Sequence, residues 1–385
     1  MNISGKNWSR RTILVASLSA LCAAFVGCGG TDSQGGGSGE TSTDATSMWQ
    51  EGRRLTFGLD GSKVDSKRGV ELLQKAADAG SLDAQADLAT VYAEGGSESM
   101  TPTIAQDRKK ACELALKPAE AGNPLAQIVI INASPEYVGG EEKRDELRAK
   151  YSKTIVGALE KRAESDPRAK MVLAFCWARP EAFEIEQEPD MEKASRYIRE
   201  VADSGSAEAC MALCMMMDKG EFGVSEEEGL KYLQKAADAD VAVALVFLAR
   251  CYAMGIMGLE QDSEKAVALL RRAAEQGSVQ AKIALAECYA EGTGVSIDKQ
   301  KAFEFYLDAA KSEYAAEYER DDAMMKVGEC YEKGVGVEAS KHEARKWYHK
   351  AAAAGAWDAD DALERLDAPA TDAPAYAPAP DAAAE

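Results

Sequence analysis

The chain has 385 residues, of which 46% are hydrophobic and only 7% aromatic, and its formal net charge is −20. A chain of this size can bury a substantial apolar core, and the recurrence of Ala, Leu, Glu and Lys in helical patterns favours an all-helical protein. The negative charge argues against a nucleic-acid backbone or an anionic membrane surface as the main partner. With two histidines in the chain, chemistry that needs several imidazoles has little support.

The first 27 residues have the pattern of a bacterial export signal. Lys6, Arg10 and Arg11 form a basic start, and residues 12–26 are mostly apolar but shorter than a typical membrane span. Residues 9–14 (SRRTIL) also resemble the twin-arginine export motif, and the choice between this route and general secretion stays open. The pattern predicts an exported protein.

The end of this signal resembles the lipobox of bacterial lipoproteins. The junction reads Phe25-Val26-Gly27-Cys28, and the resemblance implies that Cys28 becomes the lipidated first residue of the mature chain. We therefore expect a protein of the cell envelope, held at the outer or cytoplasmic membrane with its domain outside the cytoplasm. Ordinary cleavage nearby, or an uncleaved anchor, is the alternative.

Residues 28–47 are predicted to be a lipidated cysteine followed by a flexible tether. The stretch 29–47 is rich in Gly, Ser and Thr and has no apolar periodicity, so it cannot form a core. Its root-mean-square reach is roughly 20–25 Å by coil scaling, which would hold a folded domain just off a membrane.

A helical hairpin is the repeating unit from Met48 onward, and it is clearest in residues 279–313. Its first half places Ala281, Leu285 and Tyr289 at helical spacing and stops at residues 292–295 (GTGV). The second half has the same spacing at Ala302, Tyr306, Ala309 and Ala310. Small residues stand wherever two helices must approach closely.

The end of each second helix marks the register of the repeat, with alanines followed in most units by glycine. Such a position needs a residue with positive φ, which glycine adopts without a Cβ penalty. Successive marks lie 35 to 44 residues apart, at 76–80, 119–122, 163–166, 202–205, 236–240, 273–277, 309–313 and 351–355. The pattern predicts about eight hairpins and a short helix over 357–366. Because one hairpin cannot bury its apolar face alone, the hairpins must stack into a solenoid.

These residues resemble the signature of the Sel-1-like repeat family, a relative of the tetratricopeptide solenoids. The matching positions of one unit are Ala281, Leu285, Tyr289, Gly292, Gly294, Val295, Asp298, Lys301, Ala302, Tyr306, Ala309 and Ala310. The resemblance covers roughly 48–366 and implies a right-handed α-solenoid. It is weak over 128–189, where the turn glycines are lost and 141–161 is predicted to be one longer helix.

The last segment, 367–385, is rich in Pro and Ala and acidic. It is predicted to be extended and disordered with no packing role, and a docking peptide for a partner is the alternative.

Beyond Cys22 and Cys28, seven cysteines remain, an odd number that cannot all pair within the chain. Four of them stand four residues before the turn of their repeats and are predicted to be small buried hydrophobes: Cys176, Cys251, Cys288 and Cys330. A cysteine-rich branch of the resembled family has a disulfide in each repeat and is associated with binding or cleaving β-lactams. This chain lacks the two suitably spaced cysteines per repeat, so binding or hydrolysis of β-lactams or cell-wall fragments is kept as the alternative function.

The sequence predicts no catalytic site, no cofactor and no metal. Cys210 and Cys214 share a helix face, but no histidine near them completes a ligand set. His342 and His349 could share a face of the last long helix, where surface histidines are the ordinary case. Nucleophile elbows, phosphate-binding glycine loops and HExxH motifs do not occur in the sequence.

A candidate binding face follows from aligning the first helix of each repeat. Under tetratricopeptide geometry, the residues two before and two after the Leu column face the concave side. The earlier position is occupied by Met171, Met211, Val246, Ile283 and Met325, and the later one by Phe175, Met215, Arg250, Glu287 and Glu329. This stripe is apolar and rich in methionine, with a charged edge toward the C-terminal end. It is either a ligand-facing groove or a packing surface between neighbouring first helices.

Together these features predict an envelope-anchored, non-enzymatic scaffold that binds a protein or peptide of unknown identity along this face, with no nucleic acid as partner. A purely structural or regulatory envelope protein without a groove is a further alternative.

Overall fold

The computed structural model describes residues 41–95, 104–217, 223–312 and 317–367, and within these ranges every regular element is a helix. The predicted all-helical solenoid is therefore confirmed. The signal, the lipobox and the tail from 368 onward lie outside the described residues.

Eight hairpins follow one another along the described chain, as predicted. Seven of them pair two helices directly: α2 (Thr41–Phe57) with α3 (Ser66–Asp78), α4 (Leu82–Glu94) with α5 (Arg108–Glu120), α10 (Pro167–Ala178) with α11 (Met191–Asp203), α12 (Ala207–Met217) with α13 (Glu226–Asp238), α14 (Ala242–Met254) with α15 (Ser263–Glu275), α16 (Val279–Glu291) with α17 (Lys299–Ala310), and α18 (Glu317–Lys333) with α19 (Lys341–Ala354). The third hairpin is irregular, with α6 (Pro124–Ile131), α7 (Pro135–Val138), α8 (Glu141–Ser152) and α9 (Ile155–Ala163). Short 3-10 turns η1 (Leu59–Gly61) and η2 (Pro180–Phe183) and a final helix α20 (Ala359–Asp367) complete the order.

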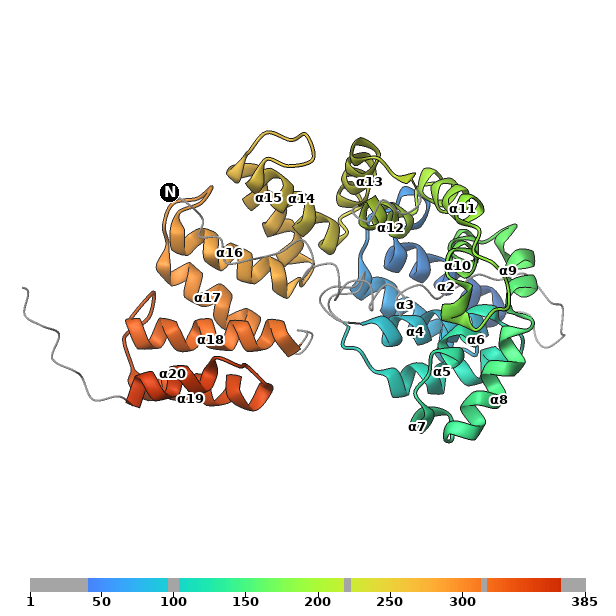
Figure 1. Ribbon diagram of the computed structural model, residues 1–385, viewed down its shortest axis with the longest axis horizontal. Coiled ribbons are helices and arrows are strands. Elements are labelled where there is room, and N and C mark those ends of the chain that lie inside the picture. The colour runs from blue at the N-terminus through green and yellow to red at the C-terminus, as the bar shows by residue number, and fades with distance from the viewer. Residues whose placement is uncertain (1–40, 96–103, 218–222, 313–316, 368–385) are drawn as a thin grey trace, which may run out of the picture.

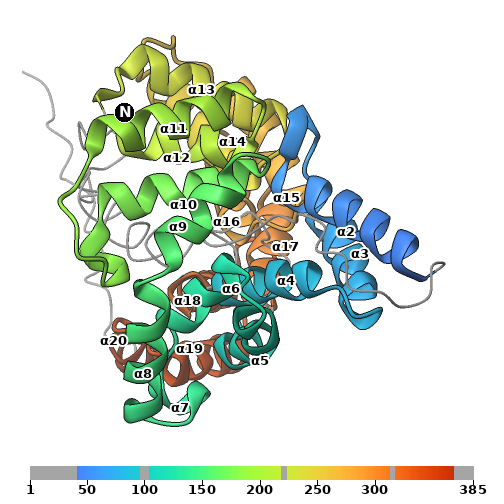
Figure 2. The ribbon, with the colours of Figure 1, turned by 90° about the vertical axis from the view of Figure 1, so that its right-hand side faces the viewer.

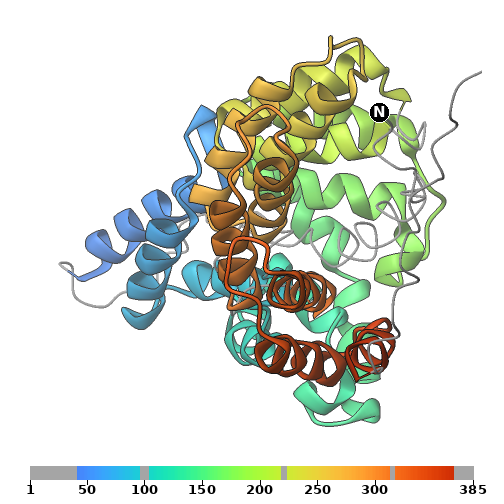
Figure 3. The ribbon, with the colours of Figure 1, turned by 90° about the vertical axis from the view of Figure 1, so that its left-hand side faces the viewer.

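The hairpins are arranged along a curve in chain order. Figure 1 shows the N-terminal hairpins on the right, α12 and α13 at the top, and α14 to α20 descending on the left. Turned so that the right-hand side of Figure 1 faces the viewer, the molecule presents α2 to α11 (Figure 2). The opposite view shows the C-terminal hairpins stacked one below another (Figure 3).

Two boundaries differ from those predicted. The first helix begins at Thr41, inside the predicted tether, because Ala45 and Trp49 lie one turn apart on a face that is buried. The predicted long helix over 141–161 is wrong, since it breaks between α8 and α9. At the break both the amide and the hydroxyl of Thr154 donate to the Tyr151 carbonyl, at 3.0 and 3.3 Å, which ends the regular ladder.

The spacing of the repeat signature has a direct structural cause at each turn inside a hairpin. The Asp298 amide donates to the Tyr289 carbonyl at 2.9 Å, and the Asp298 carboxylate accepts from the Lys301 amide at 3.0 Å, capping α17. The Lys301 ammonium then lies 5.4 Å from the centre of the Tyr289 ring. The same arrangement recurs at Tyr252, Asp262 and Lys265.

The second glycine of the turn lets neighbouring hairpins stack. A Cβ at Gly294 would lie 2.2 Å from the carbonyl oxygen of Ser263, at the start of the preceding hairpin's second helix. At Gly336 the corresponding distance, to the Lys299 carbonyl, would be 1.9 Å. Only a residue without a side chain permits this backbone-to-backbone contact.

Candidate binding face

The ten residues of the predicted face lie on the first helices α10, α12, α14, α16 and α18, but the structure does not expose them equally. The methionines Met171, Met211 and Met325 are only 1%, 6% and 6% exposed, so in this conformation they pack inside the protein. Phe175, Val246, Arg250, Ile283 and Glu329 are half-buried, and Glu287 is exposed. The Met215 side chain lies outside the part of the chain that is described.

The first helices that carry the N-terminal part of this face also carry a buried cluster of charged side chains, where four helices meet. Arg168 of α10 has no exposed side-chain area, and its guanidinium donates to both oxygens of Glu208 on α12, at 2.8 and 3.1 Å. It also donates to Asp87 of α4 at 3.2 Å and lies 3.4 Å from the ring centre of Phe57 on α2. The first helices of hairpins one, two, four and five therefore converge on one arginine.

Further contacts of α2 extend this cluster. Arg53 donates to Asp166 at 2.9 Å, and the Asp166 carboxylate accepts from the Arg168 amide at 3.0 Å, which caps α10. The Trp49 indole donates to the second oxygen of Asp87 at 2.7 Å. Each of these charges is nine-tenths or more buried, and such ions need one another because the interior cannot solvate them.

At Glu208, burial and the neighbouring positive charge have opposite effects on the pKa of the carboxyl group. Burial raises the pKa of this carboxyl, and the positive charge of Arg168 opposes the rise. The two-pronged contact with Arg168 fits an ionised carboxylate. We name Arg53, Asp87, Asp166, Arg168 and Glu208 the buried charge cluster. Sequence reasoning missed it, although Glu208 stands out as the one charge in the otherwise apolar α12.

The C-terminal part of the face remains accessible and is more strongly charged than predicted. Glu287 on α16 and Asp322 on α18 are both in contact with solvent, but the protein atoms packed around them partly exclude water and so raise the pKa of both carboxyl groups. Lys326 opposes the rise at both, while Asp322 adds to it at Glu287. These three groups are therefore close enough to interact across two first helices. Asp322 and Lys326 were missed because the alignment sampled two positions per helix and they lie outside both columns.

We define the C-terminal face as the accessible side chains on α14, α16 and α18. Its members are Val246, Arg250, Ile283, Glu287, Asp322, Lys326 and Glu329. Apolar groups stand at the α14 and α16 end and acidic groups gather toward α18. Such a face can contact an apolar side chain and a basic one on the same partner.

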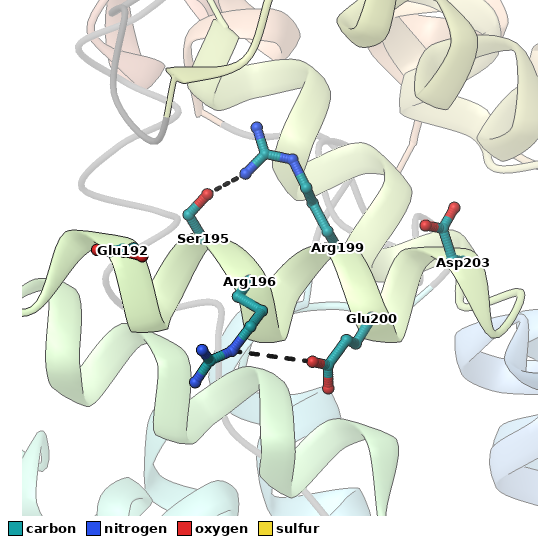
Figure 4. A pocket seen from close by; sticks show the side chains of 6 residues that line it. All are labelled: Glu192, Ser195, Arg196, Arg199, Glu200 and Asp203. Carbon is teal, nitrogen blue, oxygen red and sulfur yellow. Dashed lines mark hydrogen bonds and ion pairs between the residues drawn. The ribbon is translucent and has the colours of Figure 1, made fainter.

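A shallow depression elsewhere on the surface lies over a single outer helix, α11. Figure 4 shows its lining residues along this helix: Glu192, Ser195, Arg196, Arg199, Glu200 and Asp203. Arg199 already donates to Glu228 at 2.7 Å and to Ser195, and Lys170 is paired with Glu200. Because these groups satisfy one another, the depression is a less suitable site than the C-terminal face.

All seven cysteines of the described residues are free thiols. Cys176, Cys251 and Cys330 are buried, which confirms the prediction for them, while Cys288 is half-buried. Burial raises the pKa of the Cys251 thiol to about 11, which makes it a poor nucleophile.

His342 and His349 lie on the exposed side of α19. Within the described ranges no three His, Cys, Asp or Glu side chains are grouped as metal ligands. No helix there has the length and apolar character that a membrane crossing requires.

Comparison with known families finds the Sel1 repeat in six stretches, which together cover more than half of the chain: 47–81, 82–123, 207–241, 242–278, 279–314 and 321–355. The unmatched stretch, 124–206, contains the region in which the signature was weak. No curated protein matches the sequence.

Several solved structures are similar to this chain. A Sel1 repeat protein from Oxalobacter formigenes is 25% identical, with 84% of this chain and 88% of that chain covered and a TM-score of 0.50. A protective antigen from uropathogenic Escherichia coli strains is 19% identical, with coverage of 84% and 79% and a TM-score of 0.34. An immunity protein from Pseudomonas aeruginosa is 20% identical, with coverage of 74% and 81% and a TM-score of 0.33.

Proposed function

The chain belongs to the Sel1 repeat family, and we propose that it is a non-enzymatic scaffold that binds a protein or peptide through its C-terminal face. The supporting observation is the set of accessible side chains on α14, α16 and α18. Glu287 and Asp322 are exposed, and Val246 and Ile283 are half-buried, whereas the methionines Met171, Met211 and Met325 are packed inside the protein. A preformed curved surface of this kind binds through many modest contacts without a large ordering cost.

Charge sets the expected preference of this face. Glu287, Asp322 and Glu329 outnumber Arg250 and Lys326 on it, and the whole chain has a net charge of −20. We expect basic partner segments to be favoured and acidic ones to be repelled.

A cross-linked pull-down from envelope extract tests the proposal, with full-length wild type beside Glu287→Lys. Glu304→Lys is the matched control, because it makes the same charge change at an exposed site on the second helix α17. We expect Glu287→Lys to lose the bound partner while Glu304→Lys retains it. Equal retention by both variants would count against the face, and equal loss would point to a general charge effect.

The proposal also places the protein at a membrane through a lipid on Cys28. Palmitate labelling of wild type and of Cys28→Ala tests this part separately. We expect label in wild type and none in the variant; label in both, or in neither, contradicts the anchor.

A further inference from the structure

The first hairpin contacts the fifth, although hairpins of a solenoid ordinarily touch only their neighbours. The Gly61 amide donates to the Gly205 carbonyl at 3.0 Å, and the Ala207 amide donates back to the Gly58 carbonyl at 3.1 Å. A third bond runs from the Val64 amide to the Ala239 carbonyl at 2.8 Å. The turn over 58–65 thus reaches both ends of the α12–α13 hairpin.

Side chains reinforce this contact at Asp240. The Lys63 ammonium lies 2.6 Å from one carboxylate oxygen of Asp240, and the Arg272 guanidinium donates to the other at 3.0 Å. Asp240 has φ +60 and follows a second helix. At the equivalent position most other repeats have a glycine, such as Gly80 and Gly205. An aspartate is disfavoured in this backbone conformation, so the side chain's two cationic partners offset a local cost.

We propose that residues 58–65 form a clasp that joins the first hairpin to the fifth, so that the five N-terminal hairpins open only as one unit. The buried charge cluster gives the clasp its cooperativity. Lifting α2 away would remove Arg53 from Asp166 and expose Arg168 at Phe57, which leaves buried charges without compensation.

This inference goes beyond the proposed binding function. In the clasped half Met171 and Met211 are buried, and the accessible charged residues of the first-helix row lie on the C-terminal face. Binding and clasping are separately measurable, because Glu287 takes no part in the clasp.

Hydrogen exchange of the full-length chain, followed by mass spectrometry, tests the clasp with two matched glycine variants. Gly205→Ala and Gly122→Ala place a side chain at nearly the same backbone angle, φ +98 and +93, after a second helix. The new Cβ at 205 would lie 2.7 Å from the Gly61 amide nitrogen, whereas the one at 122 meets nothing within 4 Å. The two variants therefore share the backbone strain and differ in the clasp.

We expect Gly205→Ala to speed hydrogen exchange in the distant segment 44–65 by about fivefold or more, because the new side chain would break the hydrogen bonds of the clasp. Gly122→Ala should change that segment by less than about twofold and act near 108–131. Lys63→Glu, a surface change that places a negative charge against Asp240, should also speed exchange in 44–65, and it decides the matter if Gly205→Ala does not fold. If 44–65 exchanges in Lys63→Glu as it does in wild type, the clasp is wrong.

Discussion

At the scale of the residue, Arg168 is the fully buried cation that joins the buried charge cluster. It neutralises Glu208 and Asp87 in an interior that cannot solvate them. We predict that Arg168→Met destabilises the protein by about 3–5 kcal/mol, because it removes the cation that Glu208 contacts in the interior and the closer cation of Asp87, whose contact with the other cation, Arg53, is 4.0 Å long. Urea unfolding followed by circular dichroism measures this. The control is Arg365→Met, whose exposed pair with Glu332 should contribute about 0–1 kcal/mol; equal midpoints for the two variants would contradict the role of the cluster.

Glu287 provides a pH-dependent prediction at the same scale. Its pKa is raised in the folded protein, mainly by burial, so folding favours the protonated form. The contribution to stability is full below the unfolded pKa and is lost as the pH rises through the folded pKa. Glu287→Gln should therefore be more stable than wild type at pH 7, by about 0.3–1 kcal/mol.

Thermal melts across pH check this prediction, with Glu304→Gln as the matched exposed control. The advantage of Glu287→Gln should vanish below about pH 4, where the ordinary carboxyl is protonated. A constant advantage at every pH would show that packing, and not charge, is responsible.

At the scale of the element, the hairpins could be predicted from the signature residues because these residues interact with others that are close in sequence. Tyr289, Asp298 and Lys301 lie close in sequence and meet at one turn, so their spacing alone predicts it. The break between α8 and α9 was missed because it depends on the hydroxyl of Thr154, a competitor that helical periodicity does not register. The early start at Thr41 was missed because a Ser/Thr-rich composition hid the apolar pair Ala45 and Trp49.

The stacking glycines give the prediction that belongs to this scale. Gly336→Ala forces a Cβ against the Lys299 carbonyl, whereas Gly258→Ala, at the same φ of +72, meets nothing within 4 Å. We expect Gly258→Ala to cost about 1–2 kcal/mol from backbone strain, and Gly336→Ala to cost about 1–3 kcal/mol more because hairpins seven and eight must separate. Urea midpoints measured side by side test this, and equal losses would remove the stacking role of the second glycine.

At the scale of the whole molecule, closure of the N-terminal half could not be predicted from the repeat. The pairs that make it are far apart in sequence: Arg53 and Asp166 are separated by 113 residues, and Lys63 and Asp240 by 177. The face was predicted from a regular superhelix, in which Met171 and Met211 would line an open side. In the structure both are buried in the core of the N-terminal hairpins, while Glu287 remains exposed as the aligned columns suggested.

The central claim is that the C-terminal face is where a partner binds. Site-specific photo-cross-linking in intact cells tests it most directly, with a photoreactive amino acid placed at position 287 or, as control, at position 304 of the full-length chain. We predict a discrete cross-linked adduct from 287 and none from 304. No adduct from 287, or the same adduct from both positions, would contradict the account.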